Sequence, residues 1–442
     1  METRPMLMLL LAPLVGAIPA AGASAPLAAV VSILQQRDTA RADSAARARA
    51  DSIRLVRELE ALARDTTARQ QPPRGQSGPI NPRFLPDISA IGEFIGDFTS
   101  GRSTQESGRR FDIREVEIGI QAAVDPYFRA DMFLGLSDLE GIAIEEAYLT
   151  ATTLPGGLQA RLGRFHLPIG KQNTTHRPEL LGAIEYPYVI QRFLGPEAGK
   201  GTGLWASAIF SPFGFYQELQ ASVVGGIGES EEELVTESPS DATIGGLGYV
   251  VRFRNYLDLS EASNLELSGS FATTRRAQPI LCDSDPACDG FDGLPGTNAR
   301  QSHIGADVTF RWRPLQQGLY RSFMLQAEYI RQLNEESPVL PDVSGAAVTY
   351  GGPVRGFTGA YLFGRYQLSR RMFLAARGDL LEDPEADGET LKAASGYLQF
   401  FPSEFSKFVL GFERVMPRGG GATHRLLLQT TFAVGPHRPH PF

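Results

Sequence analysis

The residues best suited to chemistry lie in one long stretch, 169–200, between two runs of alternating residues. It carries charges of both signs at close spacing: Lys171, His176, Arg177, Glu179, Glu185, Arg192, Glu197 and Lys200. Rings of charged side chains around a pore select ions through their electric field and the width that they leave. The apolar residues within 184–194 predict that this part of the stretch packs against the wall of the pore. An ordinary exposed loop is the alternative.

A second set of charges alternates with apolar residues and is predicted to face an aqueous interior. Its members are Arg161, Arg252, Arg254, Asp307, Arg311, Glu328, Arg365, Arg377 and Arg425. Further acidic candidates are Glu115, Glu117, Asp379 and Glu413. A Lys or Arg facing lipid near the bilayer midplane costs about 2–4 kcal/mol, so the inward orientation is expected.

Two other groups could bind or cross-link. Cys282 and Cys288 are predicted to form a disulfide in an oxidising compartment. The aspartates around them could hold Ca²⁺ but lack EF-hand spacing, which favours a solvated acidic loop. His437 and His440 are an incomplete Zn²⁺ or Cu²⁺ site. We therefore predict no cofactor and no metal.

Amphipathic strands must position these residues, and the sequence predicts sixteen of them. In the run 303–312, Ile304 and Val308 share one face, whereas Asp307 and Arg311 share the other. A period of two with one apolar and one polar face is typical of an outer-membrane barrel. The expected strands are 88–99, 111–124, 127–138, 142–154, 158–168, 201–213, 216–228, 243–259, 263–276, 301–315, 321–333, 354–369, 372–384, 389–403, 405–416 and 422–435.

The connections between these strands alternate between short and mostly long. Such a rhythm predicts tight periplasmic turns and longer outer loops. A soluble β-sandwich is the structural alternative, but its strands average about 5–6 residues, and propeller repeats are not visible. The predicted fold is therefore all-β: a transmembrane antiparallel β-barrel of about sixteen strands, with a short N-terminal periplasmic helical segment.

The N-terminal part has a different composition from the rest. Residues 1–23 are predicted to be a signal peptide, with an apolar run and a small-residue cleavage site. Residues 24–71 are predicted to form a periplasmic helical or coiled-coil segment, with a solvated spacer as the alternative. A Pro/Gly linker, 72–87, then leads to the barrel, 88–442. The predicted location is the bacterial outer membrane.

Composition excludes several classes of protein. The net charge of -8 argues against a nucleic-acid partner. After the N-terminus there is no run of about 18 apolar residues, so no transmembrane helix is expected. No catalytic triad, phosphate loop or nucleotide fingerprint stands out, and we predict that the protein is not an enzyme.

Short motifs carry a family resemblance. They are 145–149 (EEAYL), 162–165 (LGRF), 168–170 (PIG) and 211–213 (SPF). With these motifs the chain resembles the phosphate-selective porins of the O/P type and the general bacterial porins. The resemblance implies sixteen strands, a homotrimer and a third loop folded into the lumen. Phe442 resembles the terminal aromatic residue read by the barrel-assembly machinery. Phosphate specificity in that family rests on many arginines and a lysine cluster in the lumen, and no such arrangement can be located in this sequence.

The predicted function is passive diffusion of small hydrophilic solutes or ions through a lumen narrowed by the third loop. The predicted partners are outer-membrane lipid and the diffusing solutes. A binding or uptake receptor for a metal or another small ligand, without a plug domain, is the alternative. A third possibility is a barrel whose periplasmic helix tethers the outer membrane.

Overall fold

The computed structural model describes residues 86–137, 141–227, 244–279, 295–334, 339–340, 348–349, 356–382, 390–417 and 421–435. The predictions for the signal peptide, the helical segment, Cys282, Cys288, His437 and His440 lie outside these residues. The division of the chain into domains therefore stays a prediction.

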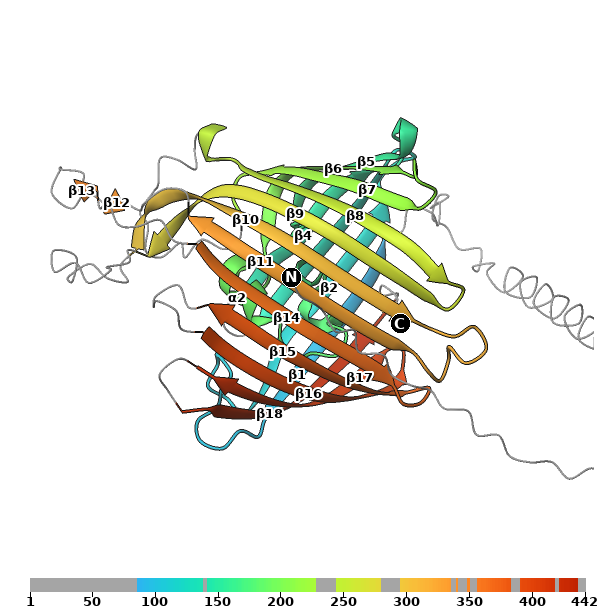
Figure 1. Ribbon diagram of the computed structural model, residues 1–442, viewed down its shortest axis with the longest axis vertical. Helices are drawn as coiled ribbons and strands as arrows, with labels where there is room; N and C mark the ends of the chain where they lie inside the picture. Colours follow the sequence, from blue (N-terminus) through green and yellow to red (C-terminus); the bar gives the residue numbers. More distant parts are fainter. Residues whose placement is uncertain are drawn as a thin grey trace, which may run out of the picture. The chain divides into compact units, whose positions relative to one another are not determined.

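In the described part of the chain, sixteen strands form one closed antiparallel barrel (Figure 1). The barrel closes where β1 pairs with β18, from Ala90 opposite Val434 to Asp97 opposite Leu427. Each barrel strand matches one of the sixteen expected ranges, so the predicted antiparallel barrel of sixteen strands is confirmed, whereas the N-terminal helical segment stays a prediction. The bounds of the first eight are β1 (Asp87–Asp97), β2 (Phe111–Ala123), β3 (Phe128–Ser137), β4 (Gly141–Ala151), β5 (Leu158–His166), β6 (Lys200–Phe210), β7 (Tyr216–Val224) and β8 (Gly248–Ser260).

The remaining barrel strands differ most from expectation at the C-terminal end of β9 and the N-terminal end of β10. These strands continue into the connection expected at 277–300. A separate pair, β12 (Val339–Leu340) and β13 (Val348–Thr349), was not predicted. The other bounds are β9 (Ser263–Pro279), β10 (Pro295–Trp312), β11 (Phe323–Asn334), β14 (Gly356–Gln367), β15 (Met372–Glu382), β16 (Thr390–Ser403), β17 (Ser406–Met416) and β18 (Thr423–Val434).

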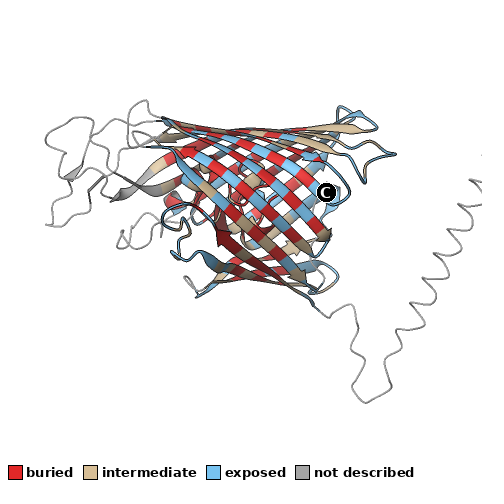
Figure 2. Cartoon of the chain, turned by 90° about the horizontal axis from the view of Figure 1, so that it is seen from below, coloured by how far each residue is buried: buried red, intermediate tan, exposed pale blue. Residues whose placement is uncertain are grey.

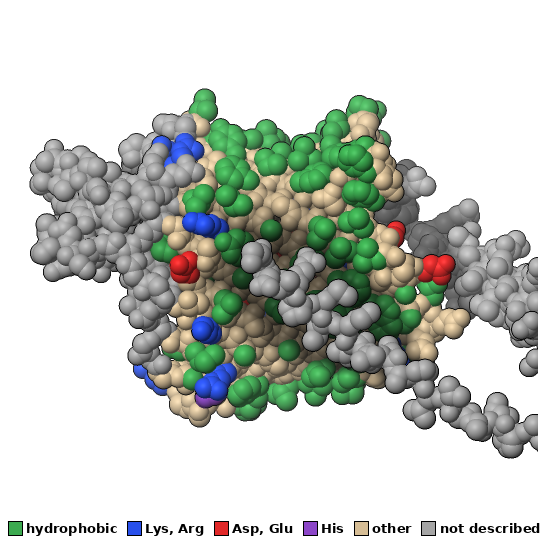
Figure 3. All heavy atoms as spheres, in the orientation of Figure 1, with side chains coloured by type: hydrophobic (Ala, Val, Ile, Leu, Met, Phe, Trp, Pro, Cys, Tyr) green, Lys and Arg blue, Asp and Glu red, His purple; other side chains and the backbone are tan. Residues whose placement is uncertain are grey.

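Burial alternates along the strands, which produces the chequered pattern of Figure 2. The exposed positions carry large apolar side chains such as Leu374, Leu398 and Phe412, whereas Arg377, Gln399 and Glu413 are buried. On the face seen in Figure 3, charged side chains gather toward the two ends of the strands. The outer surface is thus apolar and the inner surface polar, as a barrel in lipid requires.

Two of the register shifts in the described barrel interrupt the alternation and turn extra charged residues inward. The pairing of β1 with β2 slips between Glu93 and Phe94, which leaves Arg114 as the extra residue of β2. The pairing of β3 with β4 slips between Phe133 and Leu134, so Glu145 and Glu146 are both buried. Bulges often redirect side chains in this way near functional sites.

Short helices lie in the connections. They are η2 (Pro155–Gly157), η3 (Gln172–Thr174), η4 (Arg177–Glu179), α2 (Tyr188–Leu194) and η5 (Ile244–Gly246). Three of them, η3, η4 and α2, belong to the connection between β5 and β6, residues 167–199, which we call the β5–β6 segment. Among the described residues, no helix is both long and apolar enough to span a membrane.

Candidate functional site

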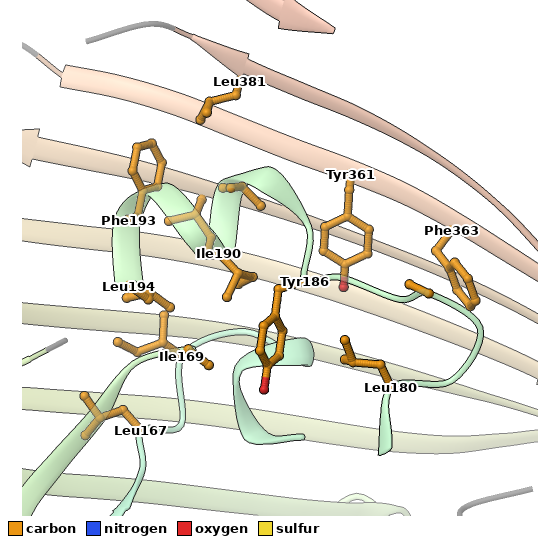
Figure 4. Close-up of a cluster of buried hydrophobic side chains, with 14 of the residues drawn as sticks. Leu167, Ile169, Leu180, Tyr186, Ile190, Phe193, Leu194, Tyr361, Phe363 and Leu381 are labelled. Atoms are coloured by element: carbon orange, nitrogen blue, oxygen red, sulfur yellow. The ribbon is translucent and has the colours of Figure 1, made fainter. Parts of the chain in front are cut away.

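The β5–β6 segment packs an apolar core against the inner face of β14 and β15. Tyr361 and Phe363 of β14 and Leu381 of β15 are buried at positions where a water-filled barrel would carry polar residues. Figure 4 shows the segment's side chains gathered beside them. These buried residues of the segment are Leu167, Ile169, Leu180, Tyr186, Ile190, Phe193 and Leu194. The prediction that 184–194 is not a freely exposed loop agrees with this packing.

Polar contacts hold the beginning of the segment to β8, β9 and β11. The Lys171 ammonium lies 2.8 Å from a Glu266 oxygen, and its backbone N–H donates to Glu328 at 3.1 Å. Arg252 donates to the Gly170 carbonyl at 2.5 Å. Gly170 has φ +63°, and a Cβ there would lie 1.4 Å from a Glu328 oxygen. Glycine is thus required where the chain passes the wall so closely.

Other strands hold the middle of the segment. Arg377 of β15 donates to the Glu185 carbonyl at 2.6 Å, and Lys407 of β17 donates to the Pro178 carbonyl at 2.7 Å. The Tyr188 hydroxyl donates to Glu413 of β17 at 3.2 Å. The segment is therefore held by strands from β8 to β17, in addition to the β5 and β6 that it connects.

Asn173 joins the two ends of the segment. Its amide donates to the Leu167 carbonyl at 2.8 Å and to the Gly199 carbonyl at 2.9 Å. Its oxygen accepts from the Gly199 N–H at 2.5 Å. The side chain is fully buried. Three hydrogen bonds of one buried side-chain amide thus hold the two ends of the segment together.

His176 fixes the segment to the wall on the side of β2 and β4. Its Nδ1 lies 2.7 Å from Glu117 and its Nε2 lies 2.9 Å from Glu146. Burial alone would lower the pKa of His176, but the two carboxylates outweigh it and raise this pKa well above its usual value. The two carboxylates thus favour the protonated, charged form of the buried ring.

A charged cluster surrounds Arg177 and Glu185. Arg114 contacts Glu185 at 2.8 Å, and Arg177 contacts Glu197 at 2.5 Å. Burial works against the charge of Glu185, but Arg114 and neighbouring guanidiniums lower its pKa overall. Burial raises the pKa of Glu197 despite Arg177 beside it. Arg425 of β18 completes the cluster, 3.6 Å from Glu185.

This cluster lines a pocket of about 210 Å³ between the segment and β2, β3 and β4. Its acidic lining residues are Glu106, Asp112, Glu115, Glu145, Glu185 and Glu197. Its basic lining residues are Arg114, Arg177 and Arg425. Six carboxyl groups against three guanidinium groups leave an excess of acidic side chains around the pocket.

The predicted segment residues are not all brought together. Arg177 and Glu185 line the pocket. Lys171 binds Glu266, Lys200 is buried against Glu145, and Arg192 is on the exposed side of α2. Their predicted role in selectivity stays a prediction.

The predicted lumen charges point to the inner face, where most have individual partners. Arg252 binds Asp307 at 3.0 Å and Arg377 binds Asp379 at 2.7 Å. Arg161 stacks on Tyr148 and Trp205, and Arg365 lies 3.8 Å above the Phe373 ring. The other partners are Glu218 and Glu266 for Arg254, Glu266 for Arg311, Tyr361 for Glu328, and Glu413 for Arg425.

Several residues of the site were not singled out by the alternation. Arg114 was missed because strict alternation places it on the lipid face beside Glu115. Glu146 was missed as a site residue for the same reason. The available signal was two adjacent charged residues within an amphipathic strand, since one of them must face lipid unless a bulge turns it inward. Glu197 was among the charges expected in the stretch 169–200, whereas His166 had no comparable signal.

Comparisons with known proteins place the fold but not the solute. No family model matches the chain. An uncharacterised protein of Aquifex aeolicus (strain VF5) is 27% identical over 396 residues, which cover 81% of this chain and 80% of that protein. The loop L8 deletion mutant of OmpT, an outer membrane protein of Vibrio cholerae, has a TM-score of 0.50 at 10% identity, covering 80% of this chain and 100% of that one.

Another solved structure similar to the chain is OmpF of Salmonella typhi in complex with daunomycin. It has a TM-score of 0.46 at 10% identity and covers 80% of this chain and 98% of that one. The likeness to the Vibrio structure shows the fold, an outer-membrane β-barrel, and the sixteen strands fit the general porins. Membership of the O/P family and the absence of enzymatic activity stay predictions.

Proposed function

We propose that the protein is a porin that lets small hydrophilic solutes or ions diffuse across the bacterial outer membrane. The lumen is narrowed by the β5–β6 segment, the third outward connection by the expected topology. The observation that carries this proposal is the set of contacts between that segment and the inner face of β8 to β17, together with the charged pocket beside β2 to β4.

The acidic excess around the pocket supports a preference for cations. Charged rings act on permeating ions through their field, and here carboxyl groups outnumber guanidinium groups six to three. Arg177 and Glu185, two of the residues expected from the sequence to set selectivity, contribute to this lining. Lys171, His176 and Lys200 serve in this proposal to hold the segment in place.

Conductance in planar lipid bilayers tests the proposal. Wild-type protein should give discrete channels, and a KCl gradient should give a zero-current potential of the sign expected for cation preference. Glu185→Gln should reduce that preference because it leaves Arg114 and Arg425 with less opposing charge. Glu404→Gln, at an exposed position between β16 and β17, is the matched control and should change nothing.

Folded protein that forms no channel would contradict the proposal and favour the alternative of a binding or uptake receptor. An anion preference in the wild type would contradict the assignment of the pocket as the selective region. The homotrimer, the contact with the assembly machinery and the periplasmic location of residues 24–71 are further parts of the proposal. Chemical cross-linking in native outer membranes tests the trimer.

A further inference from the structure

A compact group of buried histidine and glutamate side chains lies where the β5–β6 segment meets β2, β4 and β5. Its members are Glu117, Glu146, His166 and His176, which are 4%, 5%, 9% and 5% exposed. Ligand atoms of Glu146, His166 and His176 all lie within 4.8 Å of one another. This group takes no part in the pocket described above.

His166 is the member that the structure leaves without a role. Neither of its ring nitrogens makes a hydrogen bond of ordinary geometry, although the ring interacts electrostatically with the Asn173 backbone. Its ring centre lies 4.8 Å from that of His176, edge to face. A buried polar group without a proper partner carries a desolvation cost, which a ligand can offset.

The neighbours of these side chains are arranged as the outer partners of metal ligands usually are. Nδ1 of His176 lies 2.7 Å from Glu117, and Nε2 lies 2.9 Å from Oε2 of Glu146. The other Glu146 oxygen accepts from the His166 backbone N–H at 2.9 Å. Metal-bound imidazoles commonly donate their second N–H to a carboxylate in this way.

We propose that His166, His176 and Glu146 bind one divalent transition-metal ion, with Zn²⁺ as the best fit, and that Glu117 orients His176. Two imidazoles and one carboxylate are donors that Zn²⁺ favours. The negative charges of Glu146 and Glu117 balance the two positive charges of the ion. Binding displaces the proton from Nε2 of His176 to solvent, so the ring becomes a neutral ligand.

Small side-chain rotations complete the site. Tetrahedral Zn²⁺ at about 2.0–2.1 Å from its ligands places the ligand atoms about 3.4 Å apart. In the present group the ligand atoms lie within 4.8 Å of one another, and Nε2 of His176 lies only 2.9 Å from the Glu146 oxygen. Binding therefore moves His176 and Glu146 slightly apart to admit the ion and draws His166 toward it. The metal then joins Glu146 of β4 and His166 of β5 to His176 of the β5–β6 segment. It thereby fixes the segment to the barrel wall. This inference does not depend on the chain being a porin.

The test uses the full chain, folded in detergent, stripped with EDTA and titrated with ZnCl₂ by calorimetry. The changes H437A and H440A are made in every sample so that the terminal histidines cannot bind. One equivalent of zinc should bind. His166→Gln and His176→Gln should abolish this binding, and Glu117→Gln should weaken it about 10–100-fold. His424→Gln, at an exposed histidine of β18, should bind as the parent does.

Folding of each variant is checked by circular dichroism and by heat-dependent migration in gels. The zinc-loaded parent protein is also measured by X-ray absorption at the zinc edge. Its spectrum should show nitrogen and oxygen ligands that include two imidazoles, and this result stands even if a histidine variant fails to fold. The proposal is overturned if the parent binds no zinc, if folded His166→Gln binds it with parental affinity, or if the spectrum lacks two imidazoles.

Discussion

Replacing Asn173 by alanine should release the β5–β6 segment without unfolding the barrel. The change removes three hydrogen bonds, of 2.8, 2.9 and 2.5 Å, at a fully buried position. Leu167 and Gly199 keep other partners for their carbonyls, but the Gly199 N–H loses its acceptor. At about 0.5–1.5 kcal/mol net for each bond, the segment loses about 1.5–4.5 kcal/mol.

Hydrogen exchange followed by mass spectrometry measures this loss directly. Since 1.4 kcal/mol is a factor of ten, the amides of the β5–β6 segment should exchange about tenfold to a thousandfold faster in Asn173→Ala. The amides of β14 to β17 should keep their protection, because their hydrogen bonds lie within the closed barrel. The released segment should also increase channel noise in bilayers.

Asn255→Ala is the matched control for this experiment. Asn255 of β8 also makes side-chain hydrogen bonds, to Gln217 and to the Leu267 carbonyl, but it does not contact the segment through them. The segment should exchange at the wild-type rate in this variant. If the hydrogen-exchange rate of the segment were unchanged in folded Asn173→Ala, the Asn173 amide would not be what holds the two ends of the segment together.

Three further predictions concern the same segment. Gly170→Ala should disturb the docking of the segment and alter conductance, because the new Cβ meets Glu328. Gly156→Ala has similar backbone strain but places its Cβ in open space, so it should leave conductance unchanged. Equal behaviour of the two variants would contradict the close approach of Gly170 to Glu328. Cation preference should decrease as the pH is lowered, because Glu197 becomes protonated. Burial raises the pKa of Glu197, so the decrease should begin at a pH above the usual carboxyl range. Zero-current potentials measure this change, and Glu197→Gln should show a weaker pH dependence. Phe363→Ala should cost about 3–5 kcal/mol of packing and speed exchange in the segment, and an unchanged rate would mean that the apolar core does not hold it.

Much of the barrel could be predicted from the sequence, since each strand carries its own signal. The alternation of residues such as Ile304, Asp307 and Val308 is local, and it tells which face meets lipid and which meets the lumen. Reliance on this strict alternation is also the reason why two site residues were missed. Arg114 and Glu146 break the alternation, and only the paired register shows that a bulge turns them inward.

The sequence by itself determined the number of strands, their faces and the position of the long connection that carries mixed charge. Only the tertiary structure decided what that connection contacts. Lys171 and Glu328 are 157 residues apart, and Lys407 and Pro178 are 229 apart. Such contacts depend on closure of the barrel, which brings β8 to β17 around the segment. The pairing of His176 with Glu117 and Glu146 arises in the same way, because no local period connects a loop residue to two different strands.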